Sequence, residues 1–141
     1  MKAKIAKDFH WEMCHRLPFH KGPCKNIHGH SYKMRIELEG ETNGDSMILD
    51  FYDIEQVVGP LVDKFDHSFI CDEADKDTIE FLEMRGFKYN VISDYTTAEN
   101  LASVVLGEIA PKFAGYENIS RVTVRLFETE DAFAEVSRDL K

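Results

Sequence analysis

Two stretches of alternating apolar and polar side chains constrain the fold of this chain more than any other feature. They cover residues 5–15 and 30–39. A period of two is typical of strands that bury one face, because successive side chains of a strand point to opposite sides of the sheet. We therefore predict two half-buried strands that pair as a hairpin. Their apolar positions are Ile5, Phe9, Trp11 and Met13 in the first stretch, and Tyr32, Met34, Ile36 and Leu38 in the second.

Two later segments have the spacing of amphipathic helices. Apolar residues recur every three or four positions over 51–65 and again over 97–113, as expected for helices that bury one side. Thr96 and Glu99 are spaced like a capping box, in which the threonine begins the second helix and Glu99 is its third residue. One interpretation of Glu99 is therefore a capping role alone.

The remaining patterns complete a sheet. Residues 121–128 alternate again, and 132–136 is predicted to be the hairpin partner across a short turn. The acidic stretch 72–95 is predicted to hold a short helix ended by Gly86 and a short strand after it. The chain is thus predicted to be one α+β domain over residues 1–141, with an antiparallel four-stranded sheet covered by two main helices on one face.

Composition limits the classes of function. Net charge is −9, which argues against binding to nucleic acid, and no apolar run reaches the length that spans a membrane. The three cysteines form no CxxC pair, which favours reduced thiols and a cytoplasmic location. Charge is uneven, however: residues 1–35 hold eight Lys or Arg against two acids. This basic quarter suits a small, highly charged anion such as a polyphosphate, or it is merely a solvated strand.

Three histidines continue the apolar rows of the predicted hairpin. His15 follows the row of Phe9, Trp11 and Met13, while His28 and His30 precede the row that begins at Tyr32. A single inward histidine is usually a satisfied core residue, but three that converge each bring a polar nitrogen in need of a partner. A metal ion satisfies all three, and three histidines form a catalytic zinc pattern with one open position. The sequence therefore predicts a Zn²⁺ site.

Cys24 lies four residues before His28, in the segment Gly-Pro-Cys-Lys-Asn. As a fourth ligand it would close the coordination sphere and make the zinc structural. As a free thiol flanked by Lys21 and Lys25 it would have a depressed pKa and act as a base or nucleophile. Both interpretations remain open at this point.

Two further positions break their local pattern. Glu128 continues the apolar row of Val122, Val124 and Leu126, so its carboxylate points inward toward an N–H donor pair, unless the strand has already reached solvent there. Asp66-His67 follows the first predicted helix. An adjacent acid can orient a histidine as a proton relay, although such pairs also occur at ordinary helix ends.

Together these motifs resemble a known family. The segments H-R-L-P from His15, C-x3-H-G-H from Cys24 to His30, F-D-H ending at His67, T-T-A-E-N around Glu99, and F-E-T around Glu128 are similar, in order and spacing over residues 5–138, to the 6-pyruvoyl- and 6-carboxy-tetrahydropterin synthase family. The family often has P-T-S-E where this chain has T-T-A-E.

The resemblance implies a tunnelling fold (T-fold) whose subunits assemble into a β-barrel, commonly a homohexamer of two trimers with sites near subunit interfaces. It implies zinc on His15, His28 and His30, with Cys24 as the proton-abstracting residue. Asp66 and His67 would form the relay, Glu128 would anchor the pterin and take part in the relay, and Glu99 would be a second pterin contact.

The implied substrate is 7,8-dihydroneopterin triphosphate. The first expected activity is a zinc-dependent lyase that forms 6-carboxy-5,6,7,8-tetrahydropterin with loss of triphosphate and acetaldehyde, on the route to 7-deazaguanine nucleosides such as queuosine. An alternative is 6-pyruvoyl-tetrahydropterin synthase on the biopterin route. A non-catalytic zinc-binding module, closed by Cys24 and the three histidines, is the alternative from another class.

Overall fold

The computed structural model describes residues 1–141 as one six-stranded sheet with three α-helices and a short 3-10 turn. No helix combines the length and the apolar character needed to cross a membrane. The elements in chain order are β1 (Lys2–His15), the 3-10 turn Pro23–Lys25, β2 (His28–Glu41), α1 (Phe51–Phe65), β3 (Ser68–Asp72), α2 (Lys76–Arg85), β4 (Tyr89–Ile92), α3 (Ala98–Phe113), β5 (Ile119–Thr129) and β6 (Ala132–Asp139).

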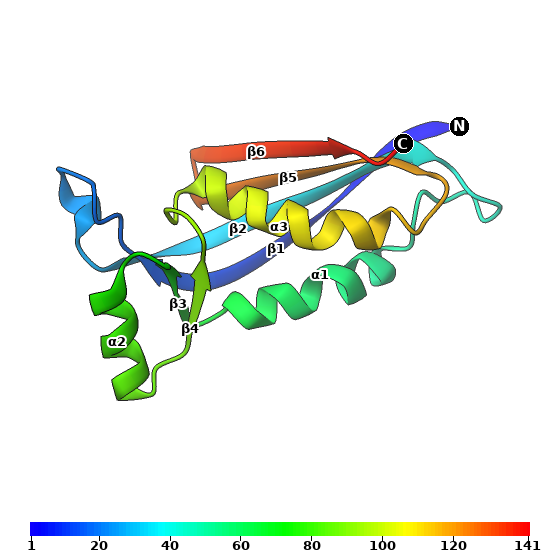
Figure 1. The fold of residues 1–141 in the computed structure, drawn as a ribbon. Helices are drawn as coiled ribbons and strands as arrows, with labels where there is room; N and C mark the ends of the chain where they lie inside the picture. The colour runs from blue at the N-terminus through cyan, green and yellow to red at the C-terminus, as the bar shows by residue number, and fades with distance from the viewer.

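Strands β1 and β2 form the long antiparallel hairpin that the alternation predicts (Figure 1). Trp11 lies opposite Tyr32, and the two rings stack with centroids 5.6 Å apart. At the loop end of the hairpin, where residues 16–27 connect the two strands, His15 lies opposite His28. The predicted apolar rows are buried from Phe9 and from Tyr32 onward, so this register places both rows on the core face.

The strand order is β4-β3-β1-β2-β5-β6. The four long strands are antiparallel, as predicted, whereas β3 and β4 extend the sheet beside the end of β1 in parallel orientation. The sheet therefore has two strands more than the four expected. Strand β3 has no alternation because all five of its residues are buried, as is common for strands that are covered on both faces.

Helices α1 and α3 lie side by side along one face of the sheet (Figure 1). Their buried side chains join the strands in one core of 25 residues. Asp50 begins α1, since its carboxylate accepts a hydrogen bond from the Tyr52 backbone N–H. Helix α3 begins at Thr97, whose hydroxyl accepts from the Asn100 N–H 3.2 Å away. The predicted capping box is therefore wrong by one residue, because Thr96 is buried in another contact.

Helix α2 lies apart from the other two, at the end of the sheet that carries β3 and β4 (Figure 1). Leu82 packs with Phe69 and Cys71, and Cys14 lies against this small cluster. Since Cys14 alternates with the inward Met13 and His15, α2 covers the face opposite α1 and α3. Gly86 ends the helix in the left-handed conformation, with φ of 70°, as the sequence predicted.

Candidate functional site

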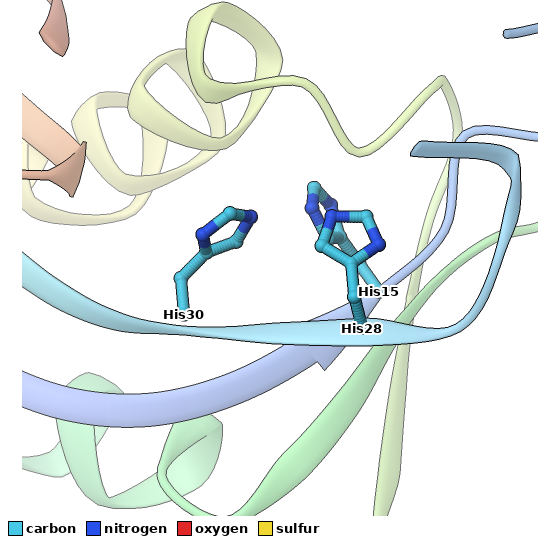
Figure 2. A group of neighbouring side chains, drawn as sticks. All are labelled: His15, His28 and His30. Carbon is cyan, nitrogen blue, oxygen red and sulfur yellow. The ribbon is translucent and has the colours of Figure 1, made fainter. Parts of the chain in front are cut away.

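The three predicted metal ligands converge at the loop end of the β1–β2 hairpin. The ring centroids of His15, His28 and His30 are 4.7 to 5.2 Å apart. Figure 2 shows the rings on the same side of the two strands, turned toward one another. One ligand nitrogen from each residue lies within 4.8 Å of the other two. The convergence predicted from strand periodicity is thus present.

Backbone acceptors orient two of the rings. The Nδ1 atom of His15 lies 2.8 Å from the Thr96 carbonyl oxygen and 3.1 Å from the Thr96 hydroxyl. The Nδ1 atom of His28 lies 2.8 Å from the carbonyl oxygen of Asn26. A carbonyl accepts a hydrogen bond only from a protonated nitrogen, so both rings carry their proton on Nδ1 and leave the Nε2 lone pair free.

The inner nitrogens lack any protein partner. Nε2 of His15 and Nε2 of His30 are buried and make no hydrogen bond, which is costly for a polar atom unless something else binds it. Burial lowers the pKa of His15 to about 4 and also lowers the pKa of His30. Both rings are therefore neutral near pH 7, which is the form that binds metal. Two buried, neutral imidazoles with unpartnered inward nitrogens, together with the His28 ring beside them, fit a metal ion.

Glu128 faces the histidines from β5. Its two carboxylate oxygens lie 4.0 Å from Nε2 of His15 and from Nε2 of His30. The side chain is 28% exposed, and burial raises its pKa, an effect that the nearby His28 partly offsets. Glu128 therefore points into the site rather than into bulk solvent, at the mouth of the histidine group.

Glu99 lies in the first turn of α3 and is exposed. A carboxylate is favourable at a helix N-terminus, and its negative charge is near enough to Glu128 to raise that residue's pKa. The two predicted pterin contacts thus lie near each other.

Cys24 occupies the 3-10 turn between β1 and β2 and is partly buried. Its sulfur is not among the atoms that share a possible ion with the three imidazoles. This placement favours a free thiol over a fourth ligand. The turn is fixed by Arg16, which donates to the carbonyl oxygen of Lys25 at 2.9 Å and forms an ion pair with Asp75 at 3.0 Å.

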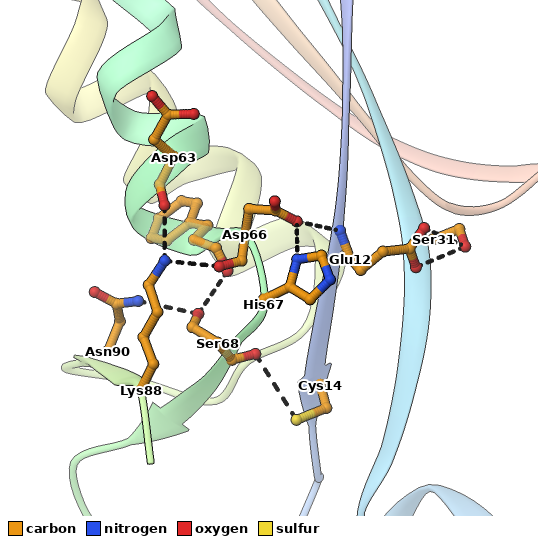
Figure 3. A network of polar contacts seen from close by, with 10 residues as sticks. Glu12, Cys14, Ser31, Asp63, Asp66, His67, Ser68, Lys88 and Asn90 are labelled. Atoms are coloured by element: carbon orange, nitrogen blue, oxygen red, sulfur yellow. Dashed lines mark hydrogen bonds and ion pairs between the residues drawn. The ribbon is translucent and has the colours of Figure 1, made fainter. Parts of the chain in front are cut away.

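Asp66 and His67 lie away from the histidine group. His67 Nδ1 is 3.0 Å from Asp66 Oδ1, and the same oxygen accepts from the Glu12 N–H (Figure 3). The backbone N–H of His67 in turn donates to the Glu12 carbonyl oxygen at 2.7 Å. The imidazole side chain is 78% exposed and lines a cavity of about 650 Å³ with Glu12, Cys14 and Ser31. These three side chains alternate with Met13, His15 and His30, so the acid–histidine pair is on the opposite face of the sheet.

Sequence reasoning missed two contributors to this arrangement. Thr96 was interpreted as a helix cap, yet it is fully buried and holds His15. Lys88 was not singled out, yet its ammonium group binds the turn that carries His67. Neither role leaves a local signal, because each depends on a partner more than 20 positions away in the chain.

Comparison with known proteins agrees with this geometry. The sequence model of the 6-pyruvoyl tetrahydropterin synthase family matches residues 4–139. The 6-carboxy-5,6,7,8-tetrahydropterin synthase of Haemophilus influenzae is 32% identical over 140 residues, covering 94% of this chain and 96% of the relative. The Rickettsia felis protein of the same name is 32% identical over 136 residues, covering 94% and 99%.

Solved structures agree in fold. The 6-pyruvoyl tetrahydropterin synthase of Plasmodium falciparum superposes with a TM-score of 0.78 at 14% identity, covering 98% of both chains. An uncharacterised Wolinella succinogenes protein also gives 0.78, at 22% identity, covering 96% of this chain and 98% of its own. The α+β T-fold expectation is thereby confirmed. This chain belongs to the 6-pyruvoyl tetrahydropterin synthase family.

Proposed function

We propose that this protein is a zinc-dependent lyase that acts on 7,8-dihydroneopterin triphosphate. The substrate and one water would give 6-carboxy-5,6,7,8-tetrahydropterin, acetaldehyde and triphosphate. The observation that carries the proposal is the convergence of three imidazoles, two of which have buried Nε2 atoms without a hydrogen-bond partner, faced by the Glu128 carboxylate. The names of the relatives over nearly the full chain favour the 6-carboxy product.

The metal role rests on His15, His28 and His30. Three nitrogen ligands with no fourth protein donor match the ligand set of catalytic zinc. When bound there, zinc supplies a Lewis acid for the side-chain hydroxyls of the substrate. The Thr96 and Asn26 carbonyl groups keep two of the rings oriented for that purpose.

The remaining residues have separate tasks. Cys24, flanked by two lysines, would remove a proton from the substrate side chain as a thiolate. His67, oriented by Asp66, would carry that proton away, and triphosphate would leave with the electron pair of its C–O bond. Glu128 would accept two N–H bonds from the amino-pyrimidine edge of the pterin, next to Glu99.

The placement of His67 supports a site shared between subunits. Because the relay is on the face opposite the metal group, we propose that His67 of one chain serves the Cys24 and zinc of a neighbour, in a homohexamer of two trimers. The sheet has unpaired edges for such an assembly. Strand β6 is an outer strand, and β1 pairs with β3 only at Met13 and Cys14, so the rest of this side of β1 has no partner strand. Unpaired edges favour pairing with another chain, here into a closed β-barrel.

We further propose a cytoplasmic location and a place on the queuosine route. The three cysteines are unpaired, as is usual for proteins of a reducing compartment. The net charge of −9 argues against nucleic acid as a partner. The pterin triphosphate is then the only ligand that the site requires besides zinc.

A product assay tests the reaction. The purified protein is incubated with dihydroneopterin triphosphate, and the products are identified by mass together with an assay for acetaldehyde. We expect 6-carboxy-tetrahydropterin and an equal amount of acetaldehyde. Formation of 6-pyruvoyl-tetrahydropterin without acetaldehyde would refute the first choice and support the biopterin-type synthase, for which the matching family is named.

A Cys24→Ala variant tests the non-catalytic alternative. If Cys24 is a free thiol, the variant keeps one zinc per chain by elemental analysis while turnover falls at least 1,000-fold. If zinc is lost together with the thiol, the site is a closed structural one and the enzyme proposal fails. Cys71→Ala is the matched control, because that thiol is buried in the cluster beside α2.

A further inference from the structure

A lysine from the segment after α2 reaches the turn that carries His67. Lys88 Nζ donates to the carbonyl oxygen of Asp63 at 2.8 Å and to that of Asp66 at 2.7 Å. Figure 3 shows this ammonium group between the last turn of α1 and the Asp66–His67 pair. One side chain thus binds the carbonyl groups on both sides of the helix end.

This turn needs support from outside. Helix α1 ends at Phe65, and His67 has a φ of 55°, a left-handed conformation that is unfavourable for a residue with a Cβ atom. The last carbonyl groups of a helix also lack partners within the helix. No glycine relieves the turn, so its conformation depends on the contacts around it.

Asn90 supplies a second set of contacts. Its Nδ2 atom donates to the Lys64 carbonyl oxygen at 3.0 Å and to the Ser68 hydroxyl at 3.1 Å. The Ser68 hydroxyl donates to the Phe65 carbonyl oxygen at 2.6 Å. Lys88 and Asn90 together therefore bind three backbone carbonyl groups between Asp63 and Asp66 and the Ser68 hydroxyl. Glu12 holds the far side of the turn through its own backbone.

We propose that Lys88 and Asn90 are positioning residues that hold the Asp66–His67 pair in the geometry of the relay. The inference rests on the proposed function for its catalytic consequence, but the positioning itself is a property of the protein alone. The charged or titratable groups that face this pair are Glu12 of β1, Lys88 before β4, and Cys14 across the cavity. The segment 73–92 would thus tie the relay to the sheet.

The test compares Lys88→Met with Lys88→Arg, Asn90→Ala and the control Lys64→Met. Lys64 lies in the last turn of α1 and contributes only its backbone carbonyl to this network. The first measurement is the ¹⁵N chemical shifts of the His67 ring, which report whether the proton stays on Nδ1 beside Asp66. The second is steady-state kinetics, and the third is the melting temperature.

We expect a single Nδ1–H tautomer in the wild type and in Lys64→Met, and a mixture in Lys88→Met and Asn90→Ala. In Lys88→Met kcat should fall about ten-fold, while KM stays within about two-fold of the wild-type value. Lys88→Arg should recover most of the kcat and most of the Nδ1–H tautomer. An unchanged tautomer in Lys88→Met would overturn the proposal, and so would equal effects in Lys64→Met.

Two outcomes keep the tests separate. If the wild type does not turn over dihydroneopterin triphosphate, the proposed function fails, whereas the tautomer measurement still decides the positioning role. If Lys88→Met does not fold, Asn90→Ala decides it: a folded Asn90→Ala protein with the wild-type tautomer overturns the proposal.

Discussion

The Nδ1 atom of His15 lies 2.8 Å from the carbonyl oxygen of Thr96, so a residue two positions before α3 orients a histidine ring at the end of β1. The two residues are 81 positions apart in the chain. The Thr96 hydroxyl adds a second contact at 3.1 Å. The start of the helix and the geometry of the histidine group are therefore coupled.

Replacing Thr96 with valine should weaken metal binding. Valine has nearly the same shape and keeps the backbone carbonyl, but it removes the hydroxyl contact to His15. Loss of a partner behind a histidine ligand typically lowers metal affinity 10- to 100-fold, and we expect about ten-fold because the carbonyl remains. Competition with a chromophoric chelator measures the change. The control is Thr123→Val, a buried threonine bonded to Ser137 far from the site; equal losses in both variants would contradict the expectation.

The metal-free protein should lose stability as the pH falls from 7 to 5. Burial lowers the folded-state pKa of His15 from 6.5 to about 4, so in this range the unfolded chain binds a proton that the folded chain does not. Stability therefore rises with pH across this window, and the loss on going from pH 7 to pH 5 is about 2 kcal/mol. Urea unfolding at both pH values measures it. A His15→Asn variant should lack this part of the loss, whereas a variant at the exposed His10, His10→Asn, should retain it. The same change in unfolding free energy between pH 7 and pH 5 in all three proteins would refute the assignment to His15.

Replacing Glu128 with glutamine should separate pterin binding from metal binding. The change removes the charge that lies 4.0 Å from His15 and His30, and hydrogen bonds to a charged group contribute about 1.5–3 kcal/mol. We expect KM for the pterin triphosphate to rise at least ten-fold with zinc content unchanged. Glu130→Gln, on the exposed turn after β5, should behave as the wild type. Loss of zinc in the Glu128 variant would instead identify this carboxylate as a ligand.

Mixed assemblies of two inactive variants should recover activity. If Cys24 and His67 of one site come from different chains, then Cys24→Ala and His67→Ala subunits complement each other when co-refolded. Random mixing at equal ratio leaves about a quarter of the sites intact. Native mass spectrometry confirms that both variants share an oligomer. Shared oligomers without activity would show that each site draws both residues from one chain.

The sequence predicted those parts of the fold that follow from one face of a strand being buried. Strands β1, β2 and β5 alternate, so their rows predicted both the core and the convergence of His15, His28 and His30. Strand β3 escaped this reasoning because both of its faces are covered and its residues show no period. The addition of β3 and β4 beside β1 could therefore not be predicted from alternation.

Tertiary contacts account for the other differences. Thr96 and Thr97 are both possible helix caps in the sequence, and only the contact of Thr96 with His15 decides between them. The role of the pair Asp66–His67 as a relay stays a prediction, and nothing near the pair in the chain indicates which face of the sheet it occupies. That placement depends on Glu12 and Lys88.

The exact pairing of β1 with β2 also limits how this protein can change. Shifting one strand by a single residue would turn Trp11 or Tyr32 out to solvent and scatter the imidazoles in the same movement. A sequence that keeps its core thereby keeps the geometry of the three histidines. New substrate preferences should therefore arise in the segments 16–27 and 73–97 rather than in the hairpin. Selection for folding alone would therefore also preserve the convergence of His15, His28 and His30.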